Sequence, residues 1–506
     1  MLMRLSALYW IWVLPILLFA GGMTAMKLDE LVFNDETLTY ARIGFFEDER
    51  PFTPFEVIDS VANKSIRHVP LYFVITSLWA RLVGFDPIVL RVLSWFCGLL
   101  AIAWTYRLGR DVIAKQAGLA AAFLIAASGY FQFYMHELRM YTMMTLLTAI
   151  VMGLYWQIVH TRHQPGYRLW VGLFASMAAL LYTHYFGLFV LLGIGVYHGL
   201  AFRRIQRWWS VSAVMLAAGL SFAPWLTHIG KAINKPTPED IVTTAMPVDR
   251  LLYNLSYLFS NGLIPVYVSL LILVIYLAVA KKQQRFFYFL VVGLVVVLAI
   301  AVSNEFVSIL RRHRMRYTLI LWPIMAAGIG AGLTQFFRQQ RLILLLLAAG
   351  WLIASFQIIP SQDLSIFESR SKWYFDRYPD FEHLLDMFDA HHLSDFDTPL
   401  ITVHYSVIPN EQTLQYYQQA LGRPLWHVTE QAVISGDGQR QAAINLEPGE
   451  SFWLAYSPPV NPQLLPIYQE QLAANHHACH MIEESGITLE YYAPSSLPCE
   501  DIPKFN

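Results

Sequence analysis

The chain alternates long apolar segments with short polar connections, and this pattern predicts a bundle of membrane-spanning helices. A helix needs about 20 apolar residues to cross the hydrocarbon core of a bilayer, and about eleven segments approach that length. The first lacks a small-residue cleavage site, so it is interpreted as a retained helix. The predicted spans are residues 5–26, 87–106, 117–135, 140–159, 169–183, 185–202, 209–227, 262–280, 286–303, 317–337 and 342–360.

Residues 68–84 are also apolar, but this segment is short and carries Arg81. Its assignment sets the orientation of every later helix. If 68–84 lies along the membrane surface, thirteen Lys and Arg residues fall in cytoplasmic connections, and if it crosses, all thirteen fall outside. The positive-inside rule therefore predicts an interfacial helix over 68–84, a cytoplasmic N-terminus and an extracytoplasmic C-terminus.

Residues 361–506 contain no predicted span and alternate strand-like and helical runs, which indicates a small α/β domain. The strand-like runs are Pro399–Tyr405, Ser451–Tyr456 and Ile487–Tyr492, and the helical runs are Glu411–Leu421 and Pro462–Asn475. The predicted architecture is mainly α: a transmembrane domain over 1–360, with 27–86 as its first extracytoplasmic loop, and a soluble α/β domain over 361–506.

Composition supports the membrane assignment and narrows the partners. The 506 residues are 56% hydrophobic and 14% charged, with a mean hydropathy of +0.43, which excludes an ordinary soluble protein. The net charge of −1 gives no indication of nucleic-acid binding. Cys97 lies in an apolar segment, whereas Cys479 and Cys499 lie near the C-terminus. If that region is extracytoplasmic, the last two are equally compatible with a disulfide and with free thiols.

The first predicted outer loop contains adjacent carboxylates, Asp35 and Glu36. A carboxylate beside the membrane is able to act as a general base toward an acceptor hydroxyl. The alternative is that both acids cap the helical run that follows them. The dipeptide alone favours capping.

Arg67 and His68 stand immediately before the predicted interfacial helix, and Tyr72 follows in its first turn. At headgroup depth a cation and an imidazole are suited to contact a lipid phosphate. Ordinary interfacial anchoring by Arg, His and Tyr is the alternative, and for this motif alone it is favoured.

Two further motifs lie in short outer connections. Glu137, Arg139 and Tyr141 join two apolar helices, where charges are costly unless they are paired or functional. A mutual ion pair is the alternative interpretation. His184 and Tyr185 lie at another predicted outer turn, where a single histidine is more often structural than catalytic.

Four arginines lie at the predicted outer end of a helix, where the orientation rule disfavours basic residues. They are Arg311, Arg312, Arg314 and Arg316, and Tyr317 follows them. Guanidinium groups bind phosphate oxygens bidentately, so the cluster fits the headgroup of a polyprenyl phosphate. Attraction to anionic phospholipids is the alternative. Both interpretations predict a phosphate.

In this order the motifs resemble the GT-C superfamily of integral membrane glycosyltransferases, in particular the branch of protein O-mannosyltransferases, lipid A aminoarabinose transferases and PMT-2-type bacterial enzymes. The resemblance covers roughly residues 5–340 and rests on Asp35-Glu36, His68-Val69-Pro70-Leu71-Tyr72, Glu137-Leu138-Arg139-Met140-Tyr141, Thr183-His184-Tyr185 and Arg316-Tyr317. The family's His-Pro-Pro-Leu is replaced here by His68-Val69-Pro70-Leu71, which loosens the match. The C-terminal domain matches no family that we can name.

The resemblance implies an inverting transferase of the bacterial cytoplasmic membrane that uses a polyprenyl-phosphate sugar. Asp35, with Glu36 beside it, would be the catalytic base, while His68, Arg314, Arg316 and Tyr317 would bind the donor phosphate. No cofactor would be required; a divalent cation at Asp35 and Glu36 is possible, although two carboxylates are an incomplete ligand set. The acceptor would be a lipid, a glycan or a protein. The residues expected to line the same cavity are Arg67, Tyr72, Glu137, Arg139, Tyr141, His184 and Tyr185.

Two alternatives from other classes are a transporter for a lipid-linked glycan and a non-catalytic membrane scaffold. A transporter is expected to bury charged residues near the membrane midplane, and the predicted spans hold few of them, with Arg91 the main one. Binding of a labelled donor without turnover would favour the scaffold.

Overall fold

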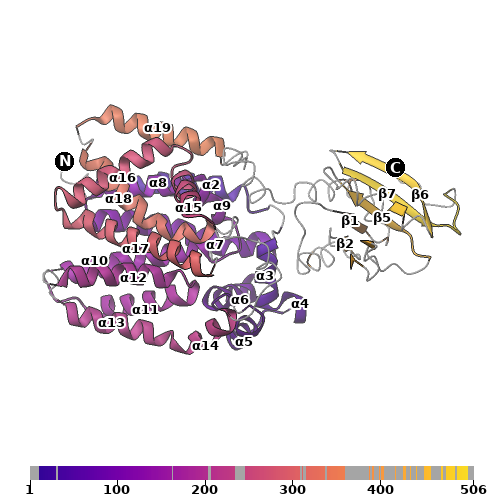
Figure 1. Ribbon diagram of the computed structural model, residues 1–506, viewed down its shortest axis with the longest axis horizontal. Coiled ribbons are helices and arrows are strands. Elements are labelled where there is room, and N and C mark those ends of the chain that lie inside the picture. The colour runs from indigo at the N-terminus through magenta and orange to yellow at the C-terminus, as the bar shows by residue number, and fades with distance from the viewer. Residues whose placement is uncertain are drawn as a thin grey trace. The chain divides into compact units, whose positions relative to one another are not determined.

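The chain divides into a helical unit and a smaller unit that contains a sheet (Figure 1). The first, called the membrane unit, comprises Met1–Glu30 and Arg42–Lys372, and the second unit comprises Leu31–Ala41 and Trp373–Asn506. The computed structural model describes residues 11–29, 32, 34–48, 50–65, 67–161, 163–202, 207–233, 246–307, 310, 315–336, 339–358, 387, 390–391, 398, 400–403, 416, 425–428, 433–434, 440–441, 449–456, 469–470, 475–484 and 487–499.

Helices account for the regular structure described in the membrane unit. They are α2 (Val13–Ala25), the last residues of α3 (Asn34–Ile43), α4 (Phe45–Asp48), α5 (Pro54–Lys64), α6 (Leu71–Val83), α7 (Pro87–Val112), α8 (Lys115–Ala126), α9 (Gly129–Met135), α10 (Tyr141–His160), α11 (Tyr167–Thr183), α12 (Gly187–Leu200), α13 (Trp208–Ser221), α14 (Ala223–Ile233), α15 (Val248–Leu258), α16 (Ile264–Val279), α17 (Gln284–Val307), the 3-10 helix η4 (Met315–Leu321), α18 (Trp322–Phe336) and α19 (Arg341–Ile358).

Each of the eleven predicted apolar segments contains helix, but a count of eleven spans is not confirmed. Among the described residues, four helical stretches are long and apolar enough to cross a membrane, and the bent pair α8 and α9 makes a fifth if it counts as one span. The four are Pro87–Val112, Tyr141–His160, Gln284–Phe306 and Met315–Phe336. Six shorter apolar helices of 10–17 residues accompany them.

The segment 117–135 is not the single helix that its apolar run predicts. α8 ends at Ala126, α9 begins at Gly129, and the two helices differ in direction by 69°. The side chain of Ser128 accepts a backbone N–H of α9 at 3.1 Å, and Gln132 Nε2 donates to the carbonyl of Ala126 at 2.5 Å. Backbone that leaves the helix at membrane depth is stable only when its polar groups are paired in this way.

α18 packs closely against α8 because Gly330 leaves room for the two backbones. A Cβ atom at Gly330 would lie 2.8 Å from the nitrogen of Ala121 and 3.0 Å from the carbonyl oxygen of Ala117. Small residues allow such close approach between membrane helices. Since η4 leads directly into α18, the contact places η4 near the end of α8 at which α9 begins.

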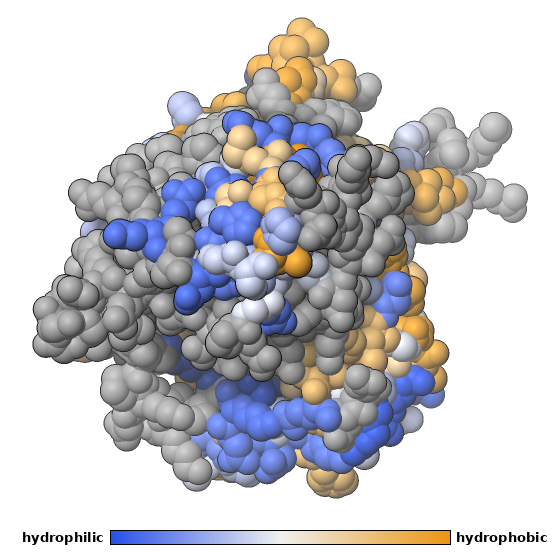
Figure 2. Space-filling model, turned by 90° about the vertical axis from the view of Figure 1, so that its right-hand side faces the viewer, coloured by the Kyte–Doolittle hydropathy of each residue, from blue (hydrophilic) through white to orange (hydrophobic). Residues whose placement is uncertain are grey.

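The predicted interfacial segment 68–84 is helical as α6, whose 13 residues are too few to cross a bilayer. Its last turn exposes Leu82, which is 79% accessible, and the neighbouring α5 exposes Phe55 at 84%. Exposed apolar side chains on short loop helices suit the membrane interface. In Figure 1, α4, α5 and α6 lie at the lower right of the membrane unit. The lower part of Figure 2 shows the molecule from that side, and the coloured residues there are mainly hydrophilic.

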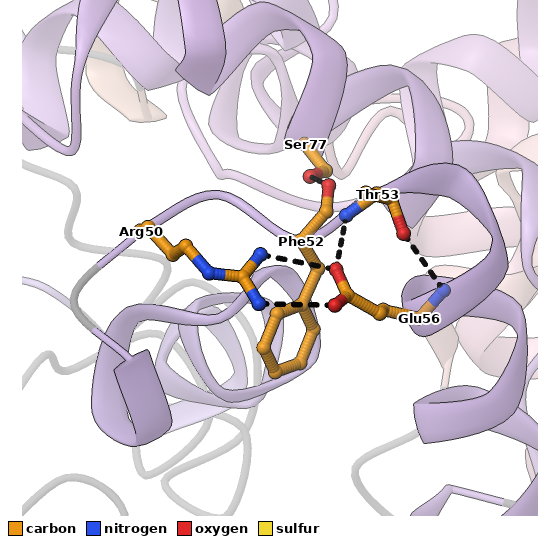
Figure 3. A network of polar contacts seen from close by, with 5 residues as sticks. All are labelled: Arg50, Phe52, Thr53, Glu56 and Ser77. Atoms are coloured by element: carbon orange, nitrogen blue, oxygen red, sulfur yellow. Dashed lines mark hydrogen bonds and ion pairs between the residues drawn. The ribbon is translucent and has the colours of Figure 1, made fainter.

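A polar network orders the turn before α5 (Figure 3). The guanidinium of Arg50 donates to both carboxylate oxygens of Glu56, at 3.0 and 3.1 Å. Thr53 forms a capping box with Glu56, because each side chain accepts the backbone N–H of the other residue. Ser77 of α6 donates to the carbonyl of Phe52 at 2.5 Å, which ties the turn to α6. These bonds fix α5 and α6 on either side of His68.

The Glu56 network predicts a pH-dependent contribution to stability. Hydrogen bonds from Arg50 and then Thr53 lower the pKa of Glu56 from 4.5 to about 2. A lowered carboxyl pKa stabilises the fold above the unfolded-state pKa, and this contribution is lost as the pH falls through the folded-state pKa. We expect Glu56→Gln to lower the melting temperature at about pH 6, with the difference from wild type shrinking toward about pH 3.

The matched control is Asp59→Asn, which removes an exposed carboxylate that accepts from Asn63 on the same helix at 2.9 Å. This variant is expected to show little of that pH-dependent difference from wild type. A Glu56→Gln difference that is as large at the acidic end as at neutral pH would contradict the assignment.

The second unit contains a five-stranded sheet in the order β2-β1-β5-β7-β6 and a two-stranded sheet formed by β3 and β4. β1 runs parallel to β2 and β5, whereas β7 runs antiparallel to β5 and β6. The three predicted strands are confirmed as β1, β5 and β7, and β6 was not predicted. Of the two predicted helical runs, only residues 416, 469–470 and 475 are described. The strands are β1 (Leu400–Val403), β2 (Leu425–Val428), β3 (Val433–Ile434), β4 (Arg440–Gln441), β5 (Phe452–Tyr456), β6 (His476–Glu484) and β7 (Ile487–Pro494).

A disulfide between Cys479 and Cys499 joins β6 to the segment after β7. Of the two states that the sequence left open for these cysteines, the structure adopts the disulfide. Cys97 is a free thiol on α7.

Candidate functional site

Two arginines from distant parts of the chain meet around one aromatic ring. The guanidinium carbon of Arg139 lies 5.9 Å from the ring centre of Tyr141, and that of Arg316 lies 5.6 Å from the same centre. Arg316 is also 5.7 Å from the ring centre of Tyr317, which lies 6.2 Å from Tyr141. The connection between α9 and α10 therefore converges with η4, as the predicted grouping of these residues requires.

Both guanidiniums are removed from bulk water. Arg139 is 1% exposed and Arg316 is 7% exposed. A buried cation is costly unless an anion or hydrogen-bond acceptors compensate it, and aromatic faces supply part of that compensation. Paired buried arginines at one end of a membrane bundle indicate a site for an anionic group.

His68 orients Arg139. Its Nε2 atom lies 3.0 Å from Nη2 of Arg139, and because a guanidinium only donates, Nε2 must be the acceptor. His68 is therefore neutral, with its proton on Nδ1. The carbonyl of Arg139 accepts from Ser94 of α7 at 3.3 Å, and Ser94 is in turn 2.7 Å from the hydroxyl of Tyr72. Tyr72 is fully buried and helps to hold this connection in place, and its place in the cavity wall stays a prediction.

Tyr185 holds His68 in place. Its hydroxyl donates to the carbonyl of His68 at 3.2 Å and accepts from Nε1 of Trp225 at 3.1 Å. Arg67, the residue before His68, is exposed. Of this motif, His68 contacts Arg139.

His184 joins the site from the turn between α11 and α12. Its ring lies 4.7 Å from that of Tyr317, and its Nδ1 atom accepts the backbone N–H of Phe186 at 3.1 Å. Burial, and after it the charge of Arg139, lowers the pKa of His184 to about 3. The imidazole is therefore neutral at physiological pH and carries its proton on Nε2.

The neighbours of Arg139 favour its charged form. Burial works against the charge of Arg139, but Tyr141, Tyr317 and Glu137 raise the pKa of its guanidinium above the ordinary value. Glu137 is itself 1% exposed. The site therefore contains two buried cations, Arg139 and Arg316, and a buried carboxylate, Glu137.

Two parts of the predicted site do not belong to the described part of the membrane unit. Arg314, with Arg311, Arg312 and His313, lies outside the described residues. Asp35 and Glu36 lie in the first turn of α3, in the second unit, where Tyr40 of α3 packs on Tyr416 with ring centres 5.1 Å apart. Acids in the first turn favour a helix through its dipole, which is the position that the capping alternative requires. Their catalytic role stays a prediction.

The carboxylates of Asp35 and Glu36 have no third ligand among the described residues that would make them a metal cluster. Within that part of the chain, His477, Cys479 and Cys499 are near enough to one another to share an ion. The two sulfur atoms are joined in the disulfide, so they are not available as thiolate ligands.

Four residues that form hydrogen bonds around the site or at the break between α8 and α9 were not predicted from the sequence. They are Ser94, Tyr130, Trp225 and Asn261. Ser94 has a weak sequence signal, since it is a hydroxyl within an apolar span. Asn261 precedes a glycine and reads as an ordinary turn residue, so nothing local indicates its contact with a distant helix break.

The fold of the chain is similar to that of two proteins of known structure, ArnT and AglB, and agrees with the GT-C fold expected from the sequence. The family model described as dolichyl-phosphate-mannose-protein mannosyltransferase matches residues 67–230, which is less than half of the chain but includes His68, Arg139, Tyr141, His184 and Tyr185. No curated protein matches the chain.

Solved structures with this fold are similar over nearly the whole chain. ArnT from Cupriavidus metallidurans bound to undecaprenyl phosphate has a TM-score of 0.56 and 14% identity, over 97% of this chain and 98% of that one. The apo state of the same protein gives 0.55 and 14%, over 95% and 97%. AglB, the archaeal oligosaccharyltransferase from Archaeoglobus fulgidus in complex with an inhibitory peptide and a dolichol phosphate, gives 0.50 and 11%, over 97% and 75%.

Proposed function

We propose that the protein is an inverting glycosyltransferase that moves a sugar from a polyprenyl-phosphate carrier to an acceptor hydroxyl at the outer face of the cytoplasmic membrane. The convergence of Arg139 and Arg316 on Tyr141 carries the proposal. Solved structures of this fold with undecaprenyl phosphate and with a dolichol phosphate support the lipid-phosphate class of donor.

The two guanidiniums of the site suit such a donor. A polyprenyl-phosphate sugar is a phosphodiester with one negative charge, and guanidinium groups bind phosphate oxygens bidentately. His68 acts on the phosphate through Arg139, since its Nε2 atom is occupied by that guanidinium. Tyr317, which lies between Arg316 and His184, completes the wall around the phosphate position.

The reaction is a displacement at the anomeric carbon. The acceptor oxygen forms a bond to that carbon as the bond to the phosphate oxygen breaks, and Asp35 takes the acceptor proton. The departing polyprenyl phosphate gains a second negative charge, so two preorganised guanidiniums stabilise the transition state more than the bound donor. Attack opposite the leaving group inverts the configuration.

The outer face is favoured by two independent features. The distribution of Lys and Arg among the connections orients the N-terminus inward and the second unit outward. Disulfides persist in oxidising compartments, and Cys479–Cys499 lies in the second unit. The acceptor is a lipid, a glycan or a protein hydroxyl.

The test is transfer of label from several radiolabelled polyprenyl-phosphate sugars, in membranes that contain the wild-type protein or none. Lipid, protein and polysaccharide fractions are counted separately, which identifies the acceptor class as well as the sugar. Label that appears in one fraction only with the protein is the expected result. Tight donor binding without incorporation from any donor would refute transfer and favour a transporter or a scaffold.

A further inference from the structure

The break between α8 and α9 is held by a residue that is distant in sequence. Asn261, in the turn between α15 and α16, donates from Nδ2 to the carbonyl of Ala127 at 2.7 Å and accepts the backbone N–H of Gly129 at 3.1 Å. It is 3% exposed and has a φ of 50°, a left-handed conformation that asparagine tolerates better than most residues. One side chain thus pairs the carbonyl and the amide on either side of the break.

The redirected α9 brings Tyr130 to the start of η4. The Tyr130 hydroxyl donates to the carbonyl of Met315 at 2.5 Å and lies 3.3 Å from the hydroxyl of Thr318. Thr318 also donates to the Met315 carbonyl, at 2.7 Å. That carbonyl belongs to the peptide bond that leads into Arg316, so two hydroxyls fix the backbone from which the Arg316 side chain extends.

The short helix α9 also contacts Tyr141, the ring against which both arginines lie. Tyr134 packs edge-on against Tyr141, with ring centres 5.2 Å apart, and also contacts Tyr130 at 5.6 Å. Tyr141 is the ring that both guanidiniums face. α9 therefore contacts both the backbone next to Arg316 and the aromatic surface against which Arg316 lies.

We propose that Tyr130 is a positioning residue for donor binding, which holds Arg316 in its phosphate-binding orientation through the Met315 carbonyl, with Asn261 setting the direction of α9. The inference rests on the proposed function, because it assigns Arg316 to the donor phosphate. Loss of the Tyr130 hydroxyl leaves the Met315 carbonyl to Thr318 alone and lets the start of η4 turn. Arg316 then binds phosphate in a less favourable geometry.

A double-mutant cycle separates positioning from a general structural effect. Binding of undecaprenyl phosphate to the full chain in nanodiscs is measured for wild type, Tyr130→Phe, Arg316→Lys and the double variant, with undecaprenol as the phosphate-free probe. We expect Tyr130→Phe to weaken undecaprenyl phosphate binding about tenfold, the effect of losing one hydrogen bond. In the Arg316→Lys background, Tyr130→Phe should weaken binding by less than a further factor of about two, because the effects of residues that act through one another are not additive.

Tyr288→Phe is the matched control. Tyr288 is a fully buried tyrosine whose hydroxyl also donates to a backbone carbonyl, that of Met152, at 3.1 Å. Its substitution is expected to leave binding unchanged. Equal weakening by Tyr130→Phe in both backgrounds, or equal effects of Tyr130→Phe and Tyr288→Phe, would overturn the inference while leaving the proposed function intact.

A second variant guards against misfolding of Tyr130→Phe. Thr318→Val removes the other hydroxyl on the Met315 carbonyl and keeps Tyr130, and the same loss of additivity with Arg316→Lys is expected. Unchanged binding in this variant would count against the inference. If wild type binds undecaprenyl phosphate no better than undecaprenol, the proposed function fails and the role of Tyr130 fails with it.

Discussion

Asp35→Asn is expected to lower the rate of sugar transfer by about 10²–10⁴-fold, the usual contribution of a general base, with little change in donor binding. Asparagine keeps the shape and one acceptor oxygen of the side chain but cannot take a proton from the acceptor. If Asp35 serves only the α3 dipole, the substitution costs about 0.3–1 kcal/mol of stability and leaves the rate intact. Initial rates and melting temperatures of the purified protein distinguish the two roles.

The neighbouring acid tests which carboxylate is the base. Glu36 is fully buried, whereas Asp35 is partly accessible, so the acceptor reaches Asp35 more readily. Glu36→Gln should therefore retain much more activity than Asp35→Asn. Asp59→Asn, on exposed α5, serves as the matched control and should transfer sugar at the wild-type rate. A wild-type rate in Asp35→Asn would remove Asp35 from the mechanism.

Much of the helical fold could be predicted because apolar length is a local property of the sequence. Residues 140–159 form α10 within one residue of the predicted limits, whereas α7 begins at the predicted Pro87 and continues past the predicted end to Val112. The break in 117–135 could not be predicted in the same way, because the partner of its backbone is Asn261, more than a hundred residues away. α15 was missed for another reason: its apolar residues recur with helical spacing but form no continuous run.

The sequence named several residues that meet in the structure, but it did not predict their contacts. Motifs at the ends of helices identified Arg139, Tyr141, His184 and Tyr317, because polar residues at those positions interrupt long apolar runs. Their convergence depends on the three-dimensional path of η4 and α9. The assignment of His68 to the donor phosphate stays a prediction, and its contact with Arg139 was not predicted from the sequence.

Arg316→Ala is expected to lower kcat/KM for the donor by about 10²–10³-fold, the loss typical of removing one donor to a developing negative charge. The substitution removes a buried cation from the aromatic faces of Tyr141 and Tyr317 and leaves the second charge on the leaving phosphate less stabilised. Because the interaction strengthens as the bond breaks, kcat should fall as well as kcat/KM. Acceptor KM should not change.

Arg168→Ala provides the control for this experiment. Arg168 also lies over a tyrosine ring, that of Tyr167, at 5.9 Å, but it is exposed at the opposite end of α11 from His184. Its loss should leave donor kinetics unchanged. Arg316→Lys should fall between wild type and Arg316→Ala, because lysine keeps the charge but cannot bind phosphate oxygens bidentately. Donor kinetics in Arg316→Ala equal to those of Arg168→Ala would place the phosphate elsewhere and leave the buried arginine pair with a structural role alone.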